Sequence, residues 1–292
     1  MLLVKPPEAS VSYRSLIWPH AIFLAGLAAI MAPTMYDVGR LTWTTEQGGH
    51  APIIVVTGAW AMWREFQSTH ARPQPGNGWI GYLLLGACLV MYAAGRITGI
   101  LEIEAFAMYG AIVSAAYLLV GGALLRALWF PILYLAVALP PPDQVVTLVT
   151  QPLKIGISDA AVSALHALGY PIASSGVTIQ IANYQLLVAA ACAGLNSIIS
   201  LSAICLFYVY LRHKSDWPAF LTVAALVVPV AIFSNFVRVA ALILVTYYFG
   251  EAAGQGFIHD FAGLTVFLVA LLTIFGADAL FTGFRERRRA KA

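Results

Sequence analysis

Charged residues are scarce in this chain: only 10% of its 292 residues are Asp, Glu, Lys or Arg. A soluble globular domain carries about a quarter of its residues as charged side chains, so this composition excludes that class. Hydrophobic residues make up 61% of the chain, and apolar stretches long enough to cross a bilayer recur from residue 15 to residue 284. The composition therefore predicts an all-α, polytopic integral membrane protein.

Several signatures of metal and catalytic sites are missing. The six histidines are scattered, no His-Glu-x-x-His helix occurs, and the three cysteines have no paired ligand spacing, so we expect neither a metal nor a cofactor. A Gly-x-Ser-x-Gly elbow and phosphate-binding glycine loops are absent too. The first apolar stretch is too long for a cleavable signal peptide and has no small-residue cleavage site, so we expect it to be retained.

Basic residues indicate which loops face the cytoplasm, because Lys and Arg near membrane segments are kept on that side. They precede the first apolar stretch, occupy the loops after Arg64 and Arg212, and crowd residues 285–292. We expect this basic end to be a cytoplasmic anchor rather than a nucleic-acid tail. Both termini are then cytoplasmic, and about eight spans follow, at residues 15–36, 51–63, 79–95, 105–125, 129–139, 185–210, from 217, and 261–281.

Residues 143–184 form the one substantial polar stretch, between the fifth and sixth expected spans. Apolar residues at helical spacing predict an amphipathic helix lying at the lipid surface: Val146, Leu148, Leu153, Ile157 and Ala161. The run 176–181 alternates as a strand does. Counting the spans places this segment on the extracytoplasmic side.

A thiol, a guanidinium and an imidazole reach one face of the membrane from three different segments. Cys192 lies 20 residues before Arg212, Arg238 lies 21 residues after Trp217, and His259 comes just before the last span. At about 1.5 Å of rise per residue, all three sit near the outer face of a core about 30 Å thick. These are the parts of a thiol acyl-transfer site.

Each of these residues has a simpler interpretation. In this interpretation, Cys192 is a buried cysteine that only packs against its neighbours. Arg238 extends its aliphatic stem to bring the guanidinium to the membrane interface, and His259 is an ordinary histidine at the membrane boundary. Small residues surround the thiol, at 189–194, and leave space for a substrate chain. An ionisable residue inside an apolar segment is a functional candidate, and Asn235 lies one turn from Arg238.

The remaining polar residues near the outer side are expected to be structural or solvated, namely Arg96, Glu102, Glu104 and His166. His50 is the exception, because the Gly48–Pro52 run predicts a turn that could face the same cavity. Cys88 and Cys205 are expected to be small buried apolar residues.

Three ordered motifs resemble the exosortase/archaeosortase family of polytopic membrane cysteine transpeptidases: the run 188–197 around Cys192, Asn235–Arg238, and His259–Gly263. Weaker matches at Gly49–Pro52, Leu139–Pro141, Leu168–Pro171 and Gly176 extend the family-like core to about residues 43–270 of a single membrane domain, 1–292. The chain departs from the family pattern at Ala190, Ala193 and Asn196.

The resemblance implies a protease that cleaves secreted proteins at C-terminal sorting tails, which carry a Pro-Glu-Pro-like motif, a transmembrane helix and a basic end. It implies Cys192, Arg238 and His259 as the catalytic residues. We expect substrate contacts from Asn235, Gly194, Asn196 and His50. The site would face outward from the cytoplasmic (inner) membrane. The partners would be tailed proteins and membrane lipid, with an exopolysaccharide or lipid-linked acceptor, and no nucleic acid. A transporter or flippase, and a scaffold for polysaccharide or lipid-linked glycan export, remain the alternatives.

Overall fold

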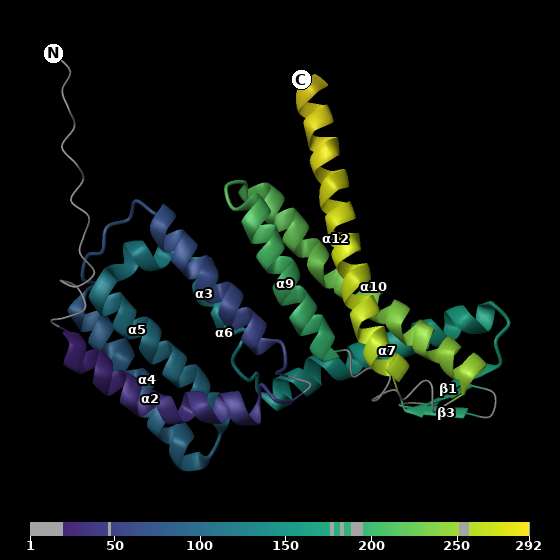
Figure 1. The fold of residues 1–292 in the computed structure, drawn as a ribbon, viewed down its shortest axis with the longest axis horizontal. Helices are drawn as coiled ribbons and strands as arrows, with labels where there is room; N and C mark the ends of the chain where they lie inside the picture. Colours follow the sequence, from purple (N-terminus) through teal and green to yellow (C-terminus); the bar gives the residue numbers. More distant parts are fainter. Residues whose placement is uncertain are drawn as a thin grey trace. The chain divides into compact units, whose positions relative to one another are not determined.

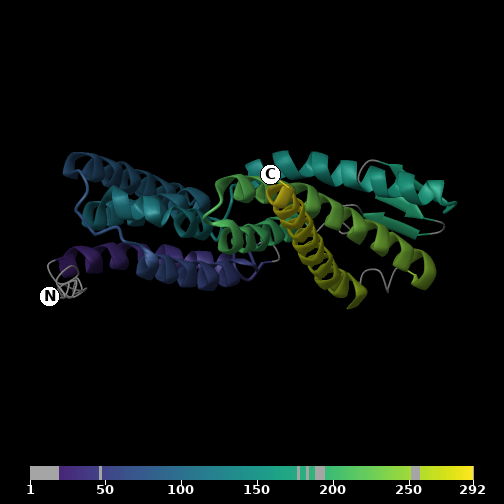
Figure 2. The same cartoon turned by 90° about the horizontal axis from the view of Figure 1, so that it is seen from above.

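The computed structural model describes residues 20–45, 48–175, 178–181, 184–187, 195–250 and 257–291. These residues are mostly helical, and the chain divides into two compact units, residues 1–140 and 141–292 (Figures 1 and 2). Five helical stretches within the described residues are long and apolar enough to cross a membrane: Ala21–Leu41, Gly78–Thr98, Leu101–Ala127, Trp217–Phe249 and Leu268–Arg287. The protein is thus a multi-pass membrane protein, and the total of eight spans stays a prediction.

The described residues of the first unit form the helices α2 (Ala21–Leu41), α3 (Ala51–Ser68), α4 (Gly78–Thr98), α5 (Leu101–Ala127) and α6 (Trp129–Ala136). Local sequence fixes both ends of α4. The Asn77 side chain accepts hydrogen bonds from the backbone N–H groups of residues 79 and 80, and Gly99 ends the helix at a φ of +71°. Helix α6 has only 8 residues, about 12 Å of rise, so the expected fifth span over 129–139 is not a single crossing helix.

A buried carboxylate joins three helices of this unit. Glu104 of α5 is 4% exposed and accepts hydrogen bonds from Thr34 of α2 and from Arg96 of α4, the latter over 2.8 Å. The Arg96 guanidinium also reaches Asp37 at 3.2 Å. Because a buried carboxylate needs such partners, Arg96 and Glu104 have a structural role, as the sequence suggests.

The second unit contains α7 (Asp143–Ala167), a small sheet, α9 (Leu195–His213), α10 (Trp217–Phe249) and α12 (Phe257–Lys291). The sheet is antiparallel in the order β1 (Ile172–Ser175), β2 (Thr178–Ile181), β3 (Tyr184–Leu187). Strand β2 confirms the alternation predicted from the sequence over residues 178–181, while residues 176 and 177 lie outside the described residues. The expected sixth span over 185–210 is wrong at its start, since Tyr184–Leu187 pairs with β2 and the helix begins at Leu195.

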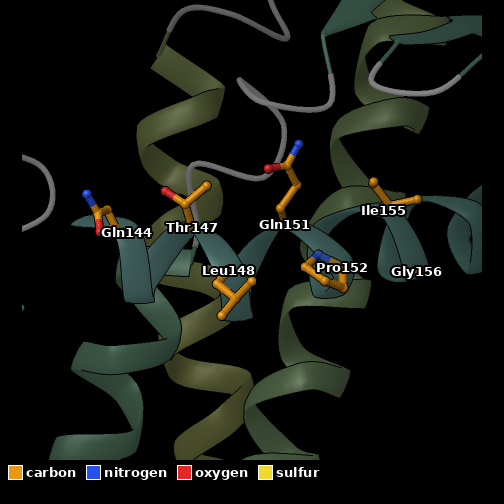
Figure 3. A pocket seen from close by; sticks show the side chains of 7 residues that line it. All are labelled: Gln144, Thr147, Leu148, Gln151, Pro152, Ile155 and Gly156. Atoms are coloured by element: carbon orange, nitrogen blue, oxygen red, sulfur yellow. The ribbon is translucent and has the colours of Figure 1, made fainter. Parts of the chain in front are cut away.

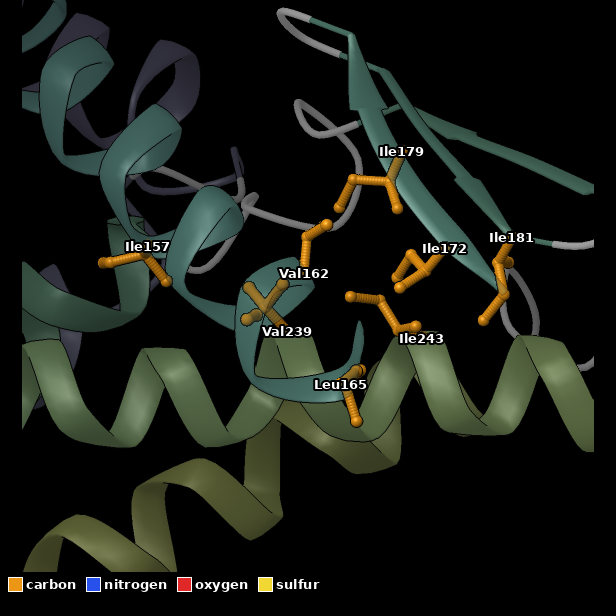
Figure 4. Packing of buried hydrophobic residues seen from close by; sticks show 9 residues of the cluster. Ile157, Val162, Leu165, Ile172, Ile179, Ile181, Val239 and Ile243 are labelled. Atoms are coloured by element: carbon orange, nitrogen blue, oxygen red, sulfur yellow. The ribbon is translucent and has the colours of Figure 1, made fainter. Parts of the chain in front are cut away.

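The core of the second unit lies between α7, α10 and the sheet (Figure 4). Ile157 and Ala161 of α7 pack with Val239 and Ile243 of α10, while Ile179 and Ile181 cover them from β2. Leu148 of the same helix is 76% exposed, and the placement of α7 at the lipid surface stays a prediction. The C-terminal half of α7 therefore supplies the buried contacts.

A second buried carboxylate connects α9 to α12. Asp278 is 1% exposed, and its oxygens accept hydrogen bonds from Tyr208 at 2.7 Å and Arg212 at 3.2 Å and lie 2.6 Å from His213 Nε2. Arg285 of α12 additionally pairs with Asp216, the residue that caps α10. The C-terminal part of α12 is thereby fixed to both neighbouring helices.

We expect Asp278→Asn to destabilise the second unit, because the amide replaces a charged acceptor that holds three side chains of α9. Losing hydrogen bonds to a charged group costs on the order of 1–3 kcal/mol in the free energy of unfolding. Thermal unfolding of the purified protein in detergent measures the effect. Thr273→Val is the matched control, since the Thr273 hydroxyl donates only to Val269 O within α12. An unchanged midpoint for Asp278→Asn would refute the structural role.

Candidate functional site

One side of α10 carries three buried polar side chains in an otherwise apolar stretch. Ser234 is 0%, Asn235 1% and Arg238 5% exposed. They share this helix because Asp216 and Pro218 start it and no glycine interrupts it before Gly250. Positions three and four residues apart lie on the same helical face, so Ser234 and Asn235 are one turn from the Arg238 guanidinium. The pairing of Asn235 with Arg238 predicted from the sequence is therefore compatible with the helix.

The direction of this polar face follows from the packing on the other side of α10. At 3.6 residues per turn, Ser234 lies about 180° and Arg238 about 140° around the axis from Ile243, which packs against α7. Besides α7 and β3, the helix contacts α9 and α12. Ser234 and Arg238 are consequently turned away from Ile243, whereas Asn235 lies about 40° around the axis from Val239 of the same core.

The Asp278 contacts allow the heights of these helices to be compared. His213 and Asp278 touch, and 18 residues of α9 separate His213 from Leu195, about 27 Å. From Asp278 back to His259 is 19 residues of α12, about 28 Å. Asp216 N–H donates to His213 O, and Arg238 follows Asp216 by 22 residues, about 33 Å. Measured along each helix from this shared end, the three positions thus lie at similar distances, about 27 to 33 Å.

Figure 1 shows the same relation in the ribbon: α9 and α12 both start at the end of the second unit where the sheet and α7 lie. His259 is in the first turn of α12, and Asn196 is the second residue of α9. Cys192 and Gly194 lie outside the described residues, just before α9. Their assignment to the site stays a prediction.

His50 lies at the start of α3, in the first unit, so its membership in this site also stays a prediction. Its Nδ1 atom is buried and has no hydrogen-bond partner among the described residues. Burial lowers the pKa of His50 below its usual value of 6.5, so the imidazole is neutral at pH 7.

The other two cysteines are free thiols in apolar surroundings, which agrees with their expected packing role. Cys205 of α9 is 1% exposed, and Cys88 packs with the cluster around Met108 in the first unit. Cys205 is thus buried as expected, whereas Cys88 is only partly buried. Within the described residues, no group of three His, Cys, Asp or Glu side chains lies close enough to hold a metal ion.

An open pocket of about 960 Å³ lies along the N-terminal half of α7 (Figure 3). Its described lining is one face of that helix: Gln144, Thr147, Leu148, Gln151, Pro152, Ile155 and Gly156. The lining combines amides and a hydroxyl with aliphatic groups and contains no charged side chain among the described residues. Such a surface suits an uncharged chain with both polar and apolar groups.

Ser234 is a candidate residue that the sequence interpretation did not single out. The only signal was its position beside Asn235 in an apolar stretch, and small serines are common in membrane helices. The lack of a hydrogen-bond partner among the described residues distinguishes its hydroxyl from that of Thr246, which is equally buried in the same helix.

Comparison with known proteins supports a family assignment. The family model described as "Transmembrane exosortase (Exosortase_EpsH)" matches residues 42–276. Comparison with curated proteins and with solved structures gave no match. The matched range includes the Cys192 motif, the Asn235–Arg238 motif and His259. The chain belongs to the transmembrane exosortase family.

Proposed function

We propose that this protein is a membrane cysteine transpeptidase that cleaves C-terminal sorting tails at the outer face of the cytoplasmic membrane. The observation that carries the proposal is the buried polar face of α10, with Arg238 at the height where α9 and α12 begin. Cys192 precedes α9 by three residues, a chain length that reaches at most about 11 Å. The family is linked to the processing of sorting signals.

In the proposed reaction, the Cys192 sulfur attacks the scissile carbonyl and His259 takes the thiol proton. Arg238 stabilises the negative charge on the tetrahedral oxyanion, and Asn235 hydrogen-bonds to a substrate carbonyl beside it. The C–N bond then breaks, the leaving amine takes the proton from His259, and a thioester remains on Cys192. An acceptor nucleophile or water releases the product and restores the thiol.

The position of the site at the membrane boundary suits this chemistry. A substrate tail held as a helix has every backbone group paired within itself, so its peptide bonds are not accessible to a nucleophile. Unwinding is least costly at the interface, because water can satisfy the freed N–H and C=O groups there. A site at this height therefore meets the tail where it can be opened, and the uncharged pocket along α7 offers room for an unwound segment.

The proposal is tested by deleting the gene for this protein and measuring the cleavage of secreted proteins that end in a short motif, an apolar helix and basic residues. We expect at least one such precursor to remain uncut and membrane-bound in the deletion strain, and to be cut again when the gene is restored. In the complemented strain, a thioester between Cys192 and the precursor should be trapped by acid quenching and released by hydroxylamine.

The control is a secreted protein without such a tail, whose maturation should not change. Normal processing of every tailed precursor in the deletion strain would overturn the sorting role. If the precursor stays uncut in the deletion strain but the complemented strain shows no hydroxylamine-sensitive adduct, the role in sorting would stand and the thiol mechanism would be refuted.

A further inference from the structure

The hydroxyl of Ser234 has unused hydrogen-bonding capacity in the interior of the protein. The side chain is fully buried, and its Oγ has no hydrogen-bond partner among the described residues. Hydroxyls in helices ordinarily donate to the carbonyl four residues earlier. Two other hydroxyls of α10 do so: Thr222 donates to Pro218 O at 2.8 Å, and Thr246, which is equally buried, donates to Leu242 O at 2.9 Å. Ser234 departs from the local rule.

The neighbouring amide repeats this observation. Both Nδ2 and Oδ1 of Asn235 are buried, and neither has a partner among the described residues. A buried donor or acceptor that makes no hydrogen bond destabilises the folded state, so each such group calls for an explanation. Two adjacent residues with the same property, one turn from Arg238, indicate a ligand that supplies the missing bonds.

The chemistry of the pair restricts that ligand. A hydroxyl and an amide together offer neutral donors and acceptors, which match the N–H and C=O groups of a peptide unit. An anionic headgroup would be drawn to the Arg238 guanidinium rather than to these neutral groups. Arg238 lies four residues after Ser234, a rise of about 6 Å along the helix, and an extended chain advances about 3.3 Å per residue. A chain running along α10 would thus present to Ser234 a peptide unit roughly two residues from the one at Arg238.

We propose that Ser234, together with Asn235, forms a binding subsite for a backbone peptide unit of the unwound substrate tail, close to the scissile bond. This inference rests on the proposed function. Ser234 is a positioning residue in this scheme: it holds the tail in register with Cys192 and Arg238 and takes no part in the bond changes. The Ser234 hydroxyl, which has no partner among the described residues, gains a hydrogen bond when the substrate binds.

The test compares Ser234→Ala with Thr246→Val, which removes a hydroxyl of equal burial from the same helix. The substrate is the purified precursor that accumulates in the deletion strain, presented in detergent micelles over a range of concentrations. We expect Ser234→Ala to raise KM roughly three- to tenfold, the size of one neutral hydrogen bond, with kcat nearly unchanged. Its thermal midpoint should equal or exceed that of the parent, since an unpaired buried group is removed. Thr246→Val should keep the parental KM.

The outcomes separate this subsite from the proposed function. A parent enzyme that cuts the precursor while Ser234→Ala keeps the parental KM would overturn the subsite alone. A lower thermal midpoint together with a lower kcat and a higher KM would assign Ser234 a purely structural role, and this result would also overturn the subsite. A purified parent that leaves every tailed precursor uncut would overturn the proposed function, and the subsite with it.

Discussion

Replacing Cys192 by alanine is expected to abolish processing of the tailed precursor. The thiol is the only proposed atom that forms a bond to the substrate, so no other side chain can replace it in acylation. Removing the nucleophile of a serine protease lowers kcat on the order of 10⁶-fold, and we expect a loss of that size here. The measurement is the amount of cleaved product in a strain that carries the variant as its only copy, at matched expression.

Two matched controls exist in the same chain. Cys205→Ala and Cys88→Ala remove thiols that pack among apolar side chains, so both variants should process the precursor at nearly the parental rate. The thioester adduct should disappear in Cys192→Ala and persist in both controls. Processing that survives in Cys192→Ala would end the thiol mechanism, and losses of equal size in all three variants would indicate general sensitivity to cysteine replacement.

Helix positions were predictable wherever local signals exist. The start of α10 at Trp217 and the limits of α4, where the prediction and the structure differ by three residues or fewer, follow from capping residues and turn formers at the ends of apolar runs. The start of α9 was not predictable, because a short apolar strand and the beginning of a membrane helix have the same hydropathy. Tyr184–Leu187 is such a run, and its pairing with β2 depends on contacts outside the run itself.

The polar interior was less visible from the sequence than the helices. Asp278 binds side chains 65 to 70 residues away in the chain, and no local sequence pattern predicts these contacts. The candidate site was partly visible, because Arg238 and Asn235 are conspicuous in an apolar stretch. Ser234 was not, since a serine in a membrane helix ordinarily bonds to its own backbone, and only its burial without a described partner sets it apart.

The burial of Arg238 also bears on why the proposed site would use an arginine in this place. Arg238 is 5% exposed, and a buried charge is retained only where it serves a purpose that offsets its desolvation. The guanidinium remains charged under all physiological conditions and is more weakly hydrated than an ammonium group, so it tolerates such a position better than lysine does. A buried, permanently charged donor meets the requirement for a preorganised oxyanion site.

Arg238→Lys is accordingly expected to be severe although the charge is formally conserved. The guanidinium offers a planar fork of N–H donors that can hold an oxyanion and a second oxygen together, whereas lysine presents a single mobile point charge. Losing one oxyanion donor typically lowers the rate by on the order of a hundredfold or more. The initial rate of precursor cleavage by purified enzyme, at saturating substrate, measures the effect, which should appear in kcat because the donor acts in the transition state.

Arg126→Lys is the matched control, because Arg126 lies near the end of α5 and its Nε donates to Gly122 O at an exposed position. This variant should retain the parental rate, which separates the geometry at Arg238 from a general effect of the substitution. A near-parental kcat for Arg238→Lys would reduce the arginine to an electrostatic anchor for the substrate. In that case the charge alone would suffice, and the oxyanion would have to be stabilised by Asn235 or by backbone N–H groups instead.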